Sequence, residues 1–179
     1  MFSKNELLNL TKKVASRLEF ISEYSGRLVA WLVLVMVVLV SYDVAMRYIF
    51  RSGSITLQEF EWHIFSLIFL LGSAYTFKHD DHVRLDLFYQ SKYMNDSKRA
   101  WVNITGGVFF LIPFCVLVIT SSWPFVSQAF IHMEGSPDPG GLPWRWLLKA
   151  SIPLGFTLLL LQGIADIFKN ITHLLEKQA

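Results

Sequence analysis

Residues 59–88 read EFEWHIFSLIFLLGSAYTFKHDDHVRLDLF and contain an uncharged apolar run, residues 64–77. Two glutamates and a histidine precede the run, and KHDDHVR follows it. In a water-soluble protein such a run would form a buried helix, but here it is one of four apolar blocks in a chain of 179 residues. We therefore predict a membrane-spanning helix whose two ends carry functional polar residues.

The composition favours an all-α membrane protein with four transmembrane helices. Hydrophobic residues make up 53% of the chain and charged residues only 17%, against roughly 25% charged residues in an average soluble domain. In water the chain would expose long uncharged runs, which promotes aggregation. The single cysteine, Cys115, lies inside an apolar run, which excludes a disulfide within the chain. Outside the apolar blocks no stripe of basic and aromatic residues indicates nucleic-acid binding.

The segment before the first apolar block, residues 1–26, is predicted to be an amphipathic helix at the membrane interface. Apolar residues recur there at spacings of three and four, among the basic residues Lys4, Lys12, Lys13 and Arg17. A cleaved signal peptide is the alternative. However, the basic lead-in is long, the next block has the length of a full span, and no small-residue cleavage site follows it. We expect an uncleaved signal anchor.

The first span is expected at about residues 28–50 and contains two charges near its end. Asp43 and Arg47 share a helical face because they are four residues apart. Such a charge costs on the order of 2.5–3.5 kcal/mol at the centre of a membrane helix, so we expect the two side chains to pair.

The second span, about residues 57–77, begins with ionisable residues. Glu59 and His63 lie on one face, and Glu61 points elsewhere. The connection to the first span is short, so these residues should lie at the depth of Arg47. We predict a bridge from Arg47 to Glu59 or Glu61.

The third apolar block, residues 101–131, has no charged residue and is too long for a single perpendicular span. At 1.5 Å per residue its 31 residues would reach roughly 46 Å, against a hydrocarbon core of about 30 Å. We expect the span at about residues 101–123, with a kink at Pro113 and an exit at residues 121–124. The segment before it, residues 78–99, is polar and amphipathic and is expected at the interface.

The fourth span is expected at about residues 146–166. It follows EGSPDPGGLP, residues 134–143, whose prolines and glycines exclude regular structure. Trp144 and Trp146 suit the membrane interface. The membrane domain as a whole is expected to cover residues 27–169, followed by a short polar tail, residues 170–179.

The basic residues are distributed unevenly between the two sides that four spans would create. Of 16 lysines and arginines, only Arg47, Arg51, Arg145 and Lys149 fall at the two connections opposite the termini. The positive-inside rule therefore predicts that both termini and the middle loop are cytoplasmic.

Two groups of residues could indicate other chemistry. His79, Asp80, Asp81 and His82 are all possible metal ligands, but their spacing matches no closed tetrahedral site, so we predict no metal. His63, with His132 as the second ligand, could hold a haem or a quinone in a redox membrane anchor. The alternative is a structural role, in which His63 forms a hydrogen bond between helices. No nucleophile with an adjacent base and no phosphate-binding loop is present, so no enzymatic activity is expected.

Five features follow one another along the chain: DVAMRYIF at residues 43–50, the acidic entrance of the second span, LGSAY at 71–75, HVRLDL at 82–87 and GGLP at 140–143. Their order resembles the small permease (DctQ-like) subunit of tripartite ATP-independent periplasmic (TRAP) transporters. The similarity covers about residues 26–169.

The resemblance implies a non-catalytic four-helix subunit of the bacterial inner membrane, without a cofactor. In that family a large multi-span permease subunit carries the substrate and ion sites, and a periplasmic solute-binding protein delivers the substrate, typically an organic acid. The small subunit is expected to brace the large one during ion-coupled uptake and to help dock the binding protein.

On this interpretation the polar residues form three groups. The periplasmic group is Asp43, Arg47, Glu59, Glu61 and His63; the cytoplasmic group is Lys78, Asp81, His82, Arg84 and Asp86; the possible binding-protein contacts are Glu134, Asp138, Gly140 and Gly141.

Overall fold

The structure is a computed structural model, and it describes residues 4–81 and 94–177. The elements are α1 (Lys4–Ile49), α2 (Ile55–Lys78), α4 (Asp96–Gly106), a π-helical turn η1 (Gly107–Leu111), α5 (Ile112–Ile131) and α6 (Arg145–Lys177). The described residues contain no strand. Four helical stretches, counting Asp96–Ile131 as one, are long and apolar enough to cross a membrane. The predicted all-α membrane architecture is confirmed.

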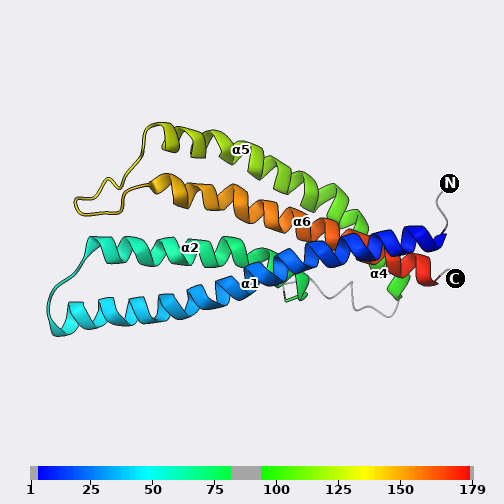
Figure 1. Cartoon of the computed structure of the whole chain (residues 1–179), viewed down its shortest axis with the longest axis horizontal. Helices are drawn as coiled ribbons and strands as arrows, with labels where there is room; N and C mark the ends of the chain where they lie inside the picture. The colour runs from blue at the N-terminus through cyan, green and yellow to red at the C-terminus, as the bar shows by residue number, and fades with distance from the viewer. Residues whose placement is uncertain (1–3, 82–93, 178–179) are drawn as a thin grey trace.

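The four long helices lie side by side in one layer (Figure 1). α6 packs against α5 on one side and α2 on the other, and α1 packs along α2 before it crosses α6 near the termini. In the most apolar part of each helix, 33% of the α6 residues are buried, against 6% in α1 and in α5. α6 is therefore the central helix, and the outer helices keep large apolar surfaces.

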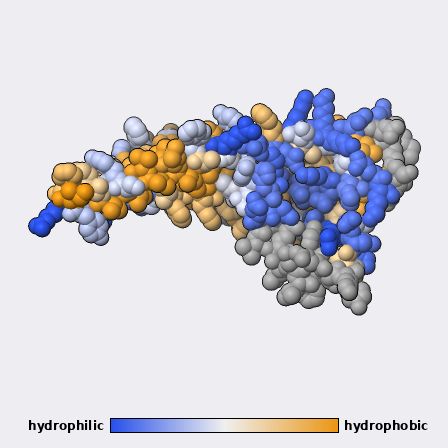
Figure 2. Space-filling model, turned by 90° about the horizontal axis from the view of Figure 1, so that it is seen from below, coloured by the Kyte–Doolittle hydropathy of each residue, from blue (hydrophilic) through white to orange (hydrophobic). Residues whose placement is uncertain are grey.

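The layer has two chemically different ends. The two-loop end carries the connections 50–54 and 132–144, and the terminal end carries both chain termini (Figure 1). Hydrophobic residues dominate the surface toward the two-loop end, and hydrophilic residues gather around the terminal end (Figure 2). The first and last described residues, Lys4 and Lys177, both lie at the terminal end (Figure 1).

α1 is one unbroken helix of 46 residues, which would be roughly 69 Å long. The expected division between residues 1–26 and the first span is therefore not a break in the helix. Its first half packs against α6, which likewise runs on through the expected polar tail to Lys177. Both helices exceed the roughly 30 Å of a hydrocarbon core. The interfacial position of residues 1–26 stays a prediction.

The third apolar block deviates from α-helical geometry one turn before Pro113. The Ile112 N–H bonds to the Gly107 carbonyl, five residues back, as in a π-helix. Pro113 has no N–H, and its ring excludes a normal α-helical bond to the carbonyl four residues earlier, so the widened turn accommodates it. The helix then continues through Pro124 to Ile131. The helix therefore continues past residues 121–124, and the membrane exit expected there stays a prediction.

Small residues allow α2 and α6 to approach closely. A Cβ atom added at Gly155 of α6 would lie 2.7 Å from the Leu70 carbonyl oxygen of α2. Ala74, on the same helix as Leu70, is fully buried, and so is Ala165 of α6. Close backbone approach at small residues is the usual way in which membrane helices gain packing energy.

Candidate functional site

Glu59 organises the two-loop end. Its side chain projects from the second turn of α2 and is only 5% exposed. The Ser136 hydroxyl donates a hydrogen bond to Glu59 Oε1, and the Leu142 backbone N–H donates to Oε2 at 2.6 Å. Both donors belong to the loop between α5 and α6, so one carboxylate fastens this loop to α2.

The loop also has its own internal hydrogen bonds. The Ser136 N–H donates to the Leu142 carbonyl at 3.0 Å, and the Gly141 N–H donates to the Asp138 carbonyl at 3.0 Å. The Asp138 N–H donates to the Ser136 hydroxyl at 3.1 Å. Gly140 has a φ of +83°, which favours glycine. The segment predicted to be irregular is therefore a specifically folded turn.

Two further contacts fix the loop. A Cβ atom at Gly141 would overlap the Ser136 side chain and come within 2.8 Å of Glu59 Oε2, so the glycine makes room for the anchor. The Thr56 hydroxyl of α2 donates to the Gly140 carbonyl. Proline-flanked, exposed residues such as Asp138 are thus displayed on a rigid support.

The Glu134 end of the loop is tied to α6. Lys149 Nζ lies 2.5 Å from Glu134 Oε2, and the Arg145 N–H donates to the Glu134 carbonyl at 2.8 Å. The lysine side chain is only 14% exposed and also lies over the Phe125 ring of α5 at 3.9 Å. The loop is therefore connected to α2, α5 and α6.

Arg47 pairs with Asp43 on its own helix, as expected from their spacing. Asp43 is 3% exposed, and its Oδ1 atom has no hydrogen-bond partner among the described residues. Across the helix interface Arg47 meets Gln58: with the amide oxygen facing the guanidinium, Nη2 and Nη1 lie 2.6 and 3.1 Å from it. The expected bridge from Arg47 to Glu59 or Glu61 is absent from the ion pairs of the described residues, because the loop occupies the Glu59 carboxylate.

The remaining predicted residues of this end lie on α2. His63 Nδ1 is 2.6 Å from the Glu59 carbonyl oxygen, and its ring centroid is 4.2 Å from that of Trp62. Glu61 Oε1 is buried and has no hydrogen-bond partner in the part of the chain that the structure describes. The other candidate haem ligand, His132, is exposed just after α5. His63 therefore contacts Glu59 through the backbone, and the buried Glu61 Oε1 atom takes no part in that contact.

Near the middle of α1, Glu23 contacts three basic side chains. Lys78 Nζ lies 2.7 Å and His79 Nε2 lies 3.3 Å from Glu23 Oε2, and Arg27 Nε lies 3.4 Å from Oε1. Lys78, a member of the predicted cytoplasmic group, thus joins α2 to α1. Asp81 is exposed. The other three members of the predicted cytoplasmic group, His82, Arg84 and Asp86, lie outside the described residues.

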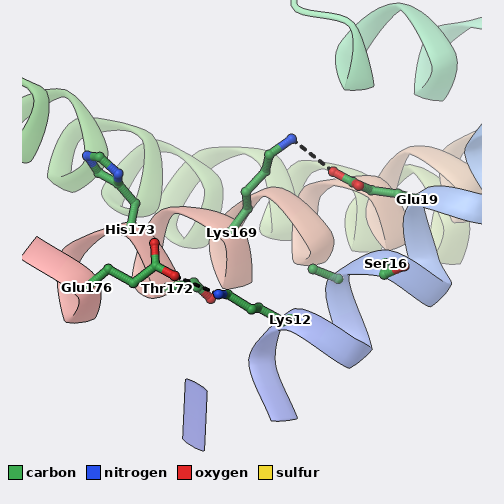
Figure 3. A pocket seen from close by; sticks show the side chains of 8 residues that line it. Lys12, Ser16, Glu19, Lys169, Thr172, His173 and Glu176 are labelled. Carbon is green, nitrogen blue, oxygen red and sulfur yellow. Dashed lines mark hydrogen bonds and ion pairs between the residues drawn. The ribbon is translucent and has the colours of Figure 1, made fainter. Parts of the chain in front are cut away.

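A second set of contacts at the terminal end joins α1 to α6 (Figure 3). Lys12 Nζ lies 2.6 Å from Glu176, and Lys169 Nζ lies 3.1 Å from Glu19. Between these pairs the Thr172 hydroxyl donates to the Thr11 hydroxyl at 2.8 Å in a buried position. These side chains line most of a pocket of about 350 Å³. Each of its lysines already has a carboxylate partner, so the arrangement holds two helices together and does not present free charge.

Reasoning from the sequence missed Glu23, Gln58, Ser136 and the Leu142 amide. A signal existed for Glu23, since it lies one turn before the first span, at the depth of Lys78. No signal existed for Ser136 or Leu142, because the path of a proline- and glycine-rich loop cannot be read from hydropathy. Among the described residues, no group of three or more His, Cys, Asp and Glu side chains could hold a metal ion.

Comparison with known proteins gives one result. The family model described as "Tripartite ATP-independent periplasmic transporters, DctQ component" matches residues 36–173, which is 138 of the 179 residues. The match includes the end of α1, all of α2 to α5, both connections of the two-loop end, and α6 as far as residue 173. No protein with a curated description matches the chain.

Proposed function

The chain belongs to the DctQ family, the small membrane component of TRAP transporters, and on this premise we propose that it braces the large permease subunit and helps to dock the binding protein. The predicted family is confirmed, and so is the transport function. A DctQ component is not an enzyme. The alternative of a haem or quinone anchor for a redox complex is therefore set aside.

We place the protein in the bacterial inner membrane with both termini in the cytoplasm. The excess of lysine and arginine at the terminal end supports this orientation through the positive-inside rule. The two-loop end then faces the periplasm, where a solute-binding protein of the transporter would approach. We propose that the transported substrate is an organic acid. The partner chains, and not this subunit, bind the substrate and the coupling ion.

The bracing role is supported by the distribution of polar and apolar contacts. The ion pairs of the described residues lie at the two-loop end and in the half of the layer that carries the termini, and most of the apolar surface of α1 and α5 is unburied. A layer one helix thick offers a broad apolar face to a partner that also lies in the membrane. Ion pairs and hydrogen bonds between the helices hold such a layer in one shape, and this role needs no substrate cavity at the centre of the layer.

The docking role rests on one observation, which is that Glu59 fixes the loop between α5 and α6 to α2. A loop that is ordered before binding loses less conformational entropy when a partner docks. Its exposed tip carries Asp138 between two prolines, a charged residue on a stiff support.

Charge reversal at the loop tip tests the docking role. In proteoliposomes that contain the complete transporter, we expect Asp138→Arg to raise the concentration of loaded binding protein needed for half-maximal uptake, with the maximal rate unchanged. Asp96→Arg is the matched control, because Asp96 is also exposed but lies at the terminal end. Equal uptake curves for both variants and the wild type would refute docking at this loop. The bracing role is tested separately, by whether the large permease subunit is recovered with the tagged chain in mild detergent.

A further inference from the structure

The first half of α1 carries two basic side chains on the face that points away from the rest of the subunit. Lys13 and Arg17 are one helical turn apart and exposed, and neither belongs to an ion pair of the described residues. The opposite face of this helix contains the buried residues Thr11 and Ala15 and packs against α6. The two cations are therefore available to a partner outside the chain.

Two aromatic residues follow the cations on the same face. Phe20 comes three residues after Arg17, and Tyr24 comes four residues after Phe20. They are 70% and 60% exposed, and exposed aromatic side chains in a membrane helix are typical of the interface between lipid and water. The face continues with the exposed apolar residues Leu28 and Trp31. It therefore passes from basic to aromatic to apolar, which is the order of headgroups, interface and hydrocarbon in one leaflet.

The spacing along the helix brings both cations within reach of the headgroups. At 1.5 Å per residue, Arg17 lies roughly 4.5 Å and Lys13 roughly 10.5 Å beyond Phe20. The headgroup layer of one leaflet is about 5–7 Å thick, and the flexible stems of lysine and arginine let their charges reach back toward it. The negative potential of an acidic leaflet extends about 8 Å further at physiological salt. The exposed Glu6 shares this face, but it lies roughly 10.5 Å further from Phe20 than Lys13 does.

We propose that Lys13 and Arg17 bind the headgroups of acidic phospholipids in the leaflet at the terminal end. Charge complementarity supports this occupant, because the nearest carboxylate toward the hydrocarbon on this side, Glu23, is already paired with Arg27 and Lys78. An acidic segment of a protein would also attract the two cations, but it would not account for the exposed aromatic residues that follow them. The proposal requires only that the chain spans a membrane, and it depends neither on the docking role nor on the bracing role.

Native mass spectrometry of the full chain tests the proposal. The protein is purified in mild detergent and titrated with palmitoyl-oleoyl phosphatidylglycerol, which is acidic, or with the phosphatidylcholine of the same acyl chains, which has no net charge. We expect tighter binding of phosphatidylglycerol. The double variant Lys13→Gln with Arg17→Gln should lower its affinity about 25-fold, from about fivefold for each cation. Binding of phosphatidylcholine should not change.

Two control variants separate the site from a general effect of charge. Lys13→Arg combined with Arg17→Lys keeps both charges and should bind phosphatidylglycerol as the wild type does. Arg51→Gln removes one exposed cation at the two-loop end and should leave the affinity unchanged, whereas Arg17→Gln alone should lower it about fivefold.

Three results would overturn the proposal. One is equal binding of the acidic lipid by the wild type and the double glutamine variant, and another is an equal loss from Arg51→Gln and Arg17→Gln. The third is loss of the permease subunit from the double glutamine variant with unchanged lipid binding, which would assign this face of α1 to a subunit contact.

Discussion

Replacement of Gly155 by alanine should separate the two central helices. The new Cβ atom would lie 2.7 Å from the Leu70 carbonyl oxygen and 2.9 Å from its Cβ, whereas ordinary contacts begin at 3.4 Å. Because the first obstacle is backbone, α2 and α6 must move apart by roughly 0.7 Å, which forfeits a quarter to a half of the dispersion energy of the atoms facing each other. Overpacking of this kind lowers the free energy of unfolding by about 1–3 kcal/mol. The higher helix propensity of alanine offsets up to about 1 kcal/mol of this loss.

Thermal unfolding of the purified subunit in detergent measures this cost, with Gly106→Ala as the matched control. Gly106 is also helical, but a Cβ atom there would meet nothing within 4 Å, so this variant should be neutral or slightly stabilised. We expect the Gly155→Ala midpoint to be the lower of the two, by roughly 2–4 °C for each kcal/mol. Equal midpoints would show that the helices are not in tight contact at Gly155 and would refute the central packing described above.

Two other predictions concern the polar contacts of Glu59 and Glu23. Glu59→Leu removes both acceptors, so the Leu142 amide should exchange with solvent roughly tenfold faster in hydrogen-exchange mass spectrometry; Glu61→Leu is the control, and a similar change there would contradict the anchor. Glu23→Lys should lower the thermal midpoint because it repels Lys78, and the added change Lys78→Glu should restore part of the loss; a double variant that is less stable than both single variants would argue against the pair.

The helix positions were largely predictable because the bilayer imposes a length on every apolar run. Asp43 and Arg47 were also predictable, since four-residue spacing fixes their mutual geometry on one helix. Helix ends were not predictable in the same way. α1 and α6 extend far beyond their apolar runs because their polar extensions pack against each other. Lys12, Glu176 and their neighbours make this contact between residues at least 150 positions apart.

The partner of Glu59 shows a second limit of sequence reasoning. The depth of a residue in the membrane can be predicted from its position along the chain, and on this basis Arg47 and Glu59 were expected at the same depth. It does not give the rotation of a helix about its axis or the route of a loop. In the structure Arg47 contacts Asp43 and Gln58. The Glu59 carboxylate accepts hydrogen bonds from Ser136 and Leu142. A hydroxyl and a backbone amide in a proline-rich turn leave no pattern that identifies them as ligands of a carboxylate.

The attachment of the loop to α2 has a mechanical consequence. A load applied to residues 134–143 enters the layer through Glu59 on one side and through Lys149 on the other. These side chains belong to α2 and α6, the two inner helices, which are in backbone contact at Gly155. A force on the loop therefore reaches both inner helices directly, and not only α5, from which the loop continues along the chain. Because the inner helices take up part of such a force, the outer helices can keep their contacts with partner subunits while the loop is loaded.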